Sequence, residues 1–129
     1  MDDQEREKLR AFEREICSRL NGLYPIAAGD EEAAALAARL AAVRLFELRR
    51  NDSALEDELL LNAGAAEAYY QYALYCGLRE DGVSSFTAGD ISYQVDASAV
   101  ERACRYRDQM LAQAQGLLRD PETFCFRRV

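Results

Sequence analysis

The amino-acid sequence predicts a mainly α-helical fold: a bundle of about four helices, with a short β-hairpin-like excursion between the third and the fourth. Long stretches are rich in strong helix formers and place apolar residues at the three- and four-residue spacing of a helix face. One internal stretch, residues 83–95, instead has the turn residues and the alternation of extended chain. A chain of 129 residues can bury one sizeable core, so we expect a single helical domain over residues 1–129.

The first helix is predicted over residues 3–20. Arg and Glu fill one face of this segment, and the opposite face carries four apolar residues, Leu9, Phe12, Ile16 and Leu20. Acidic residues in the first turn suit the positive end of the helix dipole. Gly22 and Pro25 then predict the break that follows the helix.

A second helix is predicted over residues 30–50, because EEAAALAARLAAVRLFELRR consists largely of strong helix formers. Asp30 is suited to the N-cap, and Glu31 and Glu32 follow where the helix dipole favours negative charge. The larger apolar residues form a stripe, namely Leu36, Leu40, Val43 and Leu48. The many alanines have side chains small enough to let neighbouring helices approach closely.

The third helix is predicted over residues 54–76. The sequence from Ser53 to Glu56 is typical of a capping box, in which two side chains satisfy backbone N–H groups at the helix start. Gly77 is suited to the left-handed residue that often ends a helix. Because this segment is apolar on nearly every side, we expect a central helix that other helices or neighbouring subunits surround.

The fourth helix is predicted over residues 98–119. A second capping box, Ser-x-x-Glu at 98–101, marks its start, and Pro121 closes it. Its apolar residues repeat at near-heptad spacing, and Arg107 interrupts that stripe. Residues 121–129 remain as a short C-terminal tail.

Residues 83–95 are predicted to form an extended arm between the third and fourth helices. Turn residues stand at 81–82 and 88–90, and residues 91–95 alternate apolar and polar side chains. A lone two-stranded hairpin is only marginally stable in water, so the arm must lie on the helices or be completed by another chain. Two interpretations stay open: the arm covers the end of the bundle, or it contacts a neighbouring subunit.

The residue types present predict no enzyme. Histidine is absent, which excludes Ser-His-Asp and Cys-His catalysis and any histidine-bound metal. There is no P-loop and no G-x-G-x-x-G motif to bind phosphate. The cysteines stand too far apart for the close pairs of a zinc site, so we expect free buried thiols, with a structural zinc as the minor alternative: Cys17, Cys76, Cys104 and Cys125. We therefore expect no catalytic residues, no cofactor and no metal.

Charge and hydropathy predict a chain that binds neither nucleic acid nor membrane. The net charge is −7, and residues 1–99 carry 19 acidic and 10 basic side chains, whereas residues 100–129 carry 4 and 6. An acidic body argues against nucleic-acid binding, which rests on neutralising phosphates. Opposite signs in two parts of the chain favour head-to-tail contact between copies, and a solvated acidic surface is the alternative. The N-terminus does not resemble a secretory signal, and polar residues interrupt the apolar run at 59–78.

Several features combine into a family resemblance. Three helices, the pattern S-x-x-x-G-D-[IV]-S-[VY], a further helix and a brief aromatic and basic tail follow one another along the chain. The matching residues are Ser85, Gly89, Asp90, Ile91, Ser92 and Tyr93, then LLRD at 117–120 and FCFRRV at the C-terminus. In this order of elements the chain resembles the head–tail connector (adaptor, head-completion) proteins of tailed bacteriophages and prophages.

The resemblance implies a structural protein that docks on the portal ring of a DNA-filled head. Copies would form an oligomeric collar through which DNA passes. The partners would be the portal protein and neighbouring connector or stopper subunits, at the head–tail junction of the virion, with the bacterial host cytoplasm as the location before assembly. The interface residues carried over are Phe86, Asp90, Ile91 and Tyr93 in the arm, and Phe124, Phe126, Arg127 and Arg128 in the tail.

Two alternatives remain for these assignments. The tail residues are of the types enriched at interface hot spots, but the tail is equally able to fold back on its own bundle. For the whole chain, the alternative to a connector is a small cytosolic helical module that binds or regulates another protein. A connector would meet a ring with one copy per subunit, whereas a regulator would form a dimer or a one-to-one complex.

Overall fold

The structure, a computed structural model, describes residues 1–84 and 89–119, with side chains described for residues 1–77 and 99–119. In these described residues four α-helices follow one another, and a 3₁₀ turn stands before the third and another after the fourth. Their bounds are α1 Asp3–Leu23, α2 Glu31–Leu48, η1 Asp52–Glu56, α3 Glu58–Ser84, α4 Gly89–Gln113 and η2 Gln115–Leu117. The predicted mainly helical bundle is confirmed.

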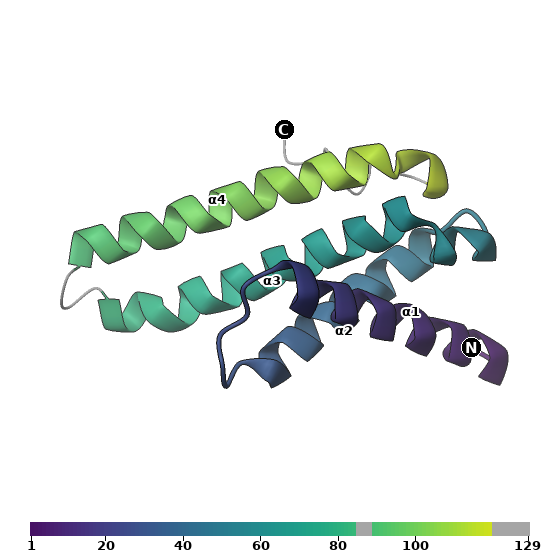
Figure 1. Ribbon diagram of the computed structural model, residues 1–129, viewed down its shortest axis with the longest axis horizontal. Coiled ribbons are helices and arrows are strands. Elements are labelled where there is room, and N and C mark those ends of the chain that lie inside the picture. The colour runs from purple at the N-terminus through teal and green to yellow at the C-terminus, as the bar shows by residue number, and fades with distance from the viewer. Residues whose placement is uncertain (85–88, 120–129) are drawn as a thin grey trace.

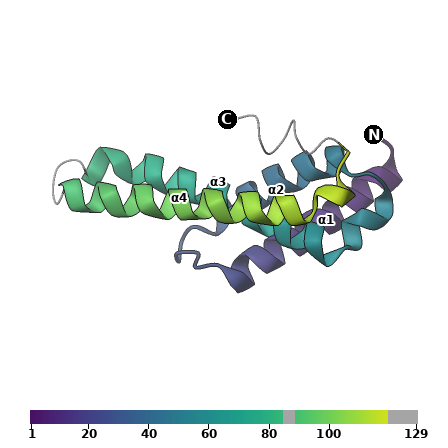
Figure 2. The same cartoon turned by 90° about the horizontal axis from the view of Figure 1, so that it is seen from above.

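The long helices α3 and α4 form an antiparallel pair, and α1 and α2 pack against the first half of α3 (Figure 1). In both views the other end of the α3–α4 pair extends well beyond α1 and α2 (Figure 2). We call α1, α2 and the parts of α3 and α4 that lie beside them the body. The Tyr72 hydroxyl marks its end, because it contacts the connection between α1 and α2 at Ala27 and Asp30. From there α3 continues to Ser84, which adds about 18 Å at the rise of an α-helix.

Helix α1 begins at Asp3 as predicted but continues through Gly22 to Leu23, three residues past the predicted end. Its buried residues are Phe12, Ile16 and Leu20. Asp2 caps it, because its carboxylate accepts a hydrogen bond from the Glu5 N–H at 2.8 Å. This face meets α3 at Gly64, where an added Cβ would lie only 2.5 Å from Ile16 Cδ1. Glycine at this position therefore allows α1 and α3 to approach closely.

Helix α2 turns most of its alanines inward and turns Leu36 and Leu40 outward. The buried residues are Ala34, Ala37, Ala38, Ala41, Ala42, Leu45 and Phe46. Of the stripe that the sequence suggests, only Leu48 is partly buried, whereas Leu36, Leu40 and Val43 are 57%, 52% and 37% exposed. The alanine face lets α2 lie close to α1 and α3, since larger side chains there would force the helices apart.

The helix starts at α2 and α3 differ in detail from the predictions. Asp30 precedes α2, but its carboxylate accepts from the Tyr72 hydroxyl at 2.7 Å and makes no cap hydrogen bond. The predicted capping box at 53–56 is wrong, because these residues lie within the 3₁₀ turn η1. Asn51 caps that turn by accepting from the Ala54 N–H at 3.2 Å, and α3 begins only at Glu58.

The predicted extended arm is wrong wherever the structure describes it. Helix α3 continues through Gly77 to Ser84, and α4 already begins at Gly89, so residues 91–95 and the predicted cap at 98–101 lie inside a helix. A two-stranded hairpin would have few partners, whereas two long helices satisfy their own backbone and pack on each other. Residues 85–88 lie outside the described part of the chain.

The described chain ends beside α2. After η2, Leu118 forms an isolated antiparallel bridge with Arg49. The Arg50 N–H donates to the Leu117 carbonyl at 2.9 Å, and the Arg119 N–H donates to the Leu48 carbonyl at 2.7 Å. Helix α4 thus stops at Gln113 and not at 119, because the last residues before Asp120 pair with the end of α2. The predicted tail, residues 121–129, lies outside the described residues.

Candidate interaction surfaces

The residues predicted to contact partners do not come together in one described site. Asp90, Ile91 and Tyr93 lie in the first turns of α4, at the end of the α3–α4 pair farthest from α1 and α2. We call this region, residues 73–84 and 89–104, the projecting end. The other predicted interface residues lie outside the described residues: Phe86, Phe124, Phe126, Arg127 and Arg128.

A buried ion pair fixes α4 on α3. Glu67 of α3 is fully buried, and its carboxylate accepts from Arg107 Nη1 at 3.3 Å and from Gln71 Nε2 at 2.8 Å. Arg44 reaches the same carboxylate from α2 at 3.4 Å. The Arg107 guanidinium also lies over the Tyr70 ring, 4.4 Å from its centroid. Because a buried charge is costly without partners, this cluster favours one register of α4 along α3.

Sequence reasoning missed this pair, although both residues gave a signal. Glu67 interrupts the apolar run of the third helix, and Arg107 interrupts the apolar stripe of the fourth. Two interruptions of opposite charge on helices that are neighbours in a bundle predict that they face each other. Arg107 also contacts Asp108 of its own helix at 3.0 Å, so one guanidinium engages two carboxylates at the point where α4 meets α3.

Tyrosines close the body where the connection between α1 and α2 meets α3 and α4. Tyr24 stacks on Tyr69 with ring centroids 4.6 Å apart, and it meets Tyr106 of α4 edge-on at 6.2 Å. Burial raises the pKa of Tyr24 well above its usual range, and Tyr106 adds to that effect. Tyr72 packs beside Tyr69 and holds the connection through its hydroxyl. Beyond these rings α3 and α4 continue without α1 and α2, which defines the start of the projecting end.

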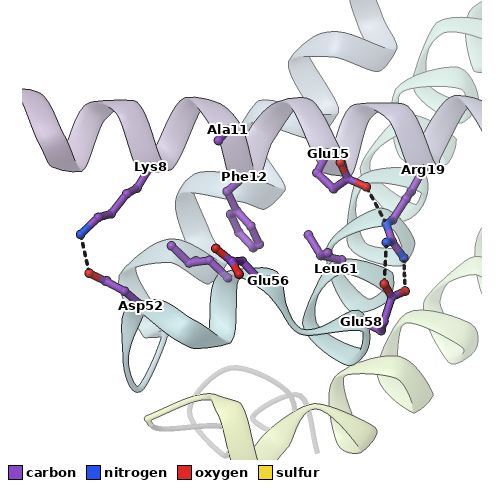
Figure 3. A pocket seen from close by; sticks show the side chains of 10 residues that line it. Lys8, Ala11, Phe12, Glu15, Arg19, Asp52, Glu56, Glu58 and Leu61 are labelled. Atoms are coloured by element: carbon purple, nitrogen blue, oxygen red, sulfur yellow. Dashed lines mark hydrogen bonds and ion pairs between the residues drawn. The ribbon is translucent and has the colours of Figure 1, made fainter.

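A groove of about 460 Å³ lies between α1 and the segment that leads into α3 (Figure 3). Phe12 and Leu61 point into it between the two elements, and ion pairs stand at both ends. At one end Lys8 Nζ lies 2.6 Å from Asp52, and at the other Arg19 binds both oxygens of Glu58 at 2.8 and 3.1 Å.

The charges at the two ends of the groove are paired with one another. Hydrogen bonds from Lys8 and then Arg49 lower the pKa of Asp52, and hydrogen bonds from Arg19 lower the pKa of Glu58. Both carboxylates therefore hold their negative charge against α1. Among residues 1–77 and 99–119 no three cysteine, aspartate or glutamate side chains gather where they could hold a metal ion. The ion pairs at the two ends of the groove tie α1 to the body, and the exposed carboxylate of Glu56 also lines the groove.

The outer face of α2 is a further surface with a distinct character. Leu36, Leu40 and Val43 lie one helical turn apart along one side, and we call these three residues the outer stripe. Single exposed apolar residues are ordinary, but a row over consecutive turns is typical of an interaction surface. The sequence marked the residues of this row without showing that they face outward.

Comparisons with protein-family models, with curated proteins and with solved structures found no match to this chain. No helix in the part of the chain that the structure describes is long and apolar enough to cross a membrane.

Proposed function

We propose that the chain is a structural assembly subunit, a head–tail connector of a tailed bacteriophage or prophage that docks on the portal ring. The observation that carries this proposal is the projecting end, which extends about 18 Å past the body and bears Gly89 to Tyr93, the residues of the family-like pattern. A helical body from which one antiparallel pair of helices projects offers a surface that can reach a neighbouring subunit or ring.

The mechanism would consist of docking, completion of a ring and sealing, with no chemical step. The projecting end replaces the extended arm as the element that carries Asp90, Ile91 and Tyr93 to a partner. An acidic body supports this role, because the net charge of −7 would repel DNA that passes through a collar and let it slide. The tail residues remain a second proposed contact on the basis of the resemblance.

The outer stripe favours a second candidate function, a small helical module that binds another protein. Leu36, Leu40 and Val43 follow the i, i+4, i+7 spacing with which a helix enters an apolar groove. Such a module would act as a dimer or in a one-to-one complex and would not need a ring.

Light scattering after size exclusion separates the two candidates. The chain is measured alone and then mixed with the portal ring encoded in the same genome. A ring-sized complex with one copy of the chain per portal subunit supports the connector. A chain that does not bind the portal ring, or that forms a dimer on its own, contradicts the connector proposal and favours the binding module.

A further inference from the structure

The outer stripe has no described element over it. Leu36 and Leu40 are each more than half exposed, and Val43 continues the row toward the C-terminal end of α2. Other large exposed apolar residues of the described surface stand on separate elements, such as Leu23 at the end of α1 and Leu59 at the start of α3. A row of this kind is typically covered by a partner surface or by another part of the same chain.

The described chain ends at one end of this row. The Arg119 N–H donates to the Leu48 carbonyl at 2.7 Å, and the Arg119 guanidinium donates to the Glu47 carbonyl. Glu47 follows Val43 by four residues and so lies on the same side of α2. Residues 120–129, which we call the C-terminal segment, therefore start at the C-terminal end of the outer stripe.

The C-terminal segment is long enough to run along the whole stripe. The eleven residues of helix from Glu47 back to Leu36 span about 17 Å. The seven residues from Arg119 to Phe126 span about 23 Å when extended, which leaves length for a bend at Pro121. Phe124 and Phe126 are two apart, so on an extended chain their side chains point to the same side.

The order of charges favours an antiparallel direction. From Glu47 toward its N-terminus, α2 carries the exposed Arg39 beside the stripe and then the exposed Glu32 at the far end. The C-terminal segment carries its acids first, at 120 and 122, and its bases last, at 127 and 128. Laid antiparallel, acids lie near Arg39 and bases near Glu32. Exposed pairs contribute little stability, so the charges set direction and the apolar contacts supply the affinity.

We propose that the outer stripe is the docking site of the chain's own C-terminal segment, which lies antiparallel to α2 with Phe124 and Phe126 on Leu40 and Leu36. This inference does not depend on the connector function, because it concerns the isolated chain. It adds a consequence for either function: the tail is held on α2, so a partner that binds Phe124, Phe126 or the outer stripe must first displace the tail.

The test is an NMR measurement on the full chain at concentrations where light scattering shows a monomer. We expect nuclear Overhauser contacts between the methyl groups of Leu36 and Leu40 and the rings of Phe124 and Phe126. The double variant Phe124→Ser with Phe126→Ser should lose these contacts and shift both leucine methyl signals. The methyl signals of Leu59, which is exposed on α3, should stay in place and serve as the control.

Three outcomes would overturn the proposal. The first is that these contacts are absent and that the double variant leaves the methyl signals of Leu36 and Leu40 unchanged. The second is contacts that occur only between differently labelled chains in a mixed sample, which would mean that a second copy covers the stripe. The third concerns direction: contacts of Phe126 with Val43 and not with Leu36 would rule out the antiparallel arrangement.

Discussion

The body and the projecting end of this molecule are built in different ways. In the body, α1, α2 and α3 pack through small residues, with Gly64 against Ile16 and a face of α2 made of alanine. In the projecting end, the described parts of α3 and α4 pack on each other, and a Cβ added at Gly77 would lie at an ordinary contact distance of 3.9 Å from Val100 Cγ2. The body therefore depends on close fit, whereas the projecting end depends on the buried Glu67–Arg107 pair that holds α4 to α3, which we call the junction.

This difference predicts where a substitution will matter for folding and where it will matter for contacts. Residues at the junction and in the alanine face should control stability. Substitutions in the projecting end, far from the core of the body, should affect assembly and leave the unfolding free energy nearly unchanged. Four variants test this division, from the largest expected loss of stability to the smallest.

Arg107→Met at the junction should have the largest effect. It removes a partner from the fully buried Glu67, and breaking a buried pair costs about 3 kcal/mol of unfolding free energy. Urea unfolding measures this loss. Arg105→Met on the exposed side of the same helix is the matched control and should change stability by less than about 0.5 kcal/mol. Equal losses in the two variants would contradict the role of the buried pair.

Ala38→Leu in the body should come second. Ala38 is fully buried, and added methyl groups in a tightly packed interface cost about 2 kcal/mol of unfolding free energy. Ala35→Leu makes the same change on the exposed side of α2 and should leave the urea midpoint nearly unchanged. If both variants lose the same stability, the alanine face does not set the distance between helices.

Tyr72→Phe at the boundary between the two regions should have a smaller effect. It removes the hydroxyl that joins α3 to the buried Asp30, and a lost hydrogen bond of this kind costs about 1 kcal/mol. Unfolding in urea measures it, and the same change in an Asp30→Ala background is the control. In that background, removing the hydroxyl should lower the unfolding free energy by less. An equal loss in both backgrounds would show that the hydroxyl does not act through Asp30.

Ile91→Asp combined with Tyr93→Ser, at the projecting end, should have the smallest effect on stability, below about 0.5 kcal/mol. The same double variant should abolish assembly on the portal ring, measured by light scattering after size exclusion. An early thermal transition would instead show that these side chains belong to the core.

Sequence reasoning succeeded where periodicity and burial agree. The 3–4–4 spacing in the first helix named Leu9, Phe12, Ile16 and Leu20; the last three are buried, and Leu9 is partly buried against the same core. The same reasoning did not show which way the second helix faces, because that helix is apolar on both sides. Side-chain size determines which face of this helix is buried, because the small alanine side chains let the neighbouring helices pack more closely.

The projecting end shows a second limit. Ile91, Tyr93 and Val95 favour strands in isolation, and the alternation around them suggested an arm. Their helical state depends on a long neighbouring helix, which is a tertiary effect that local patterns do not contain. The Glu67–Arg107 pair could have been predicted in part, because each residue interrupts an apolar stripe. That the two residues pair with each other was shown only by the structure.

The most direct test of the central claim, that the projecting end carries the contacts of this chain, is amide hydrogen exchange on the chain alone and on the portal ring. We expect peptides that cover residues 89–95 to gain protection on the ring. Peptides that cover residues 12–20 of α1 should exchange equally slowly in both states, because that face is already buried in the body. A chain that does not stay on the ring, or protection that appears elsewhere and not at residues 89–95, would contradict the account.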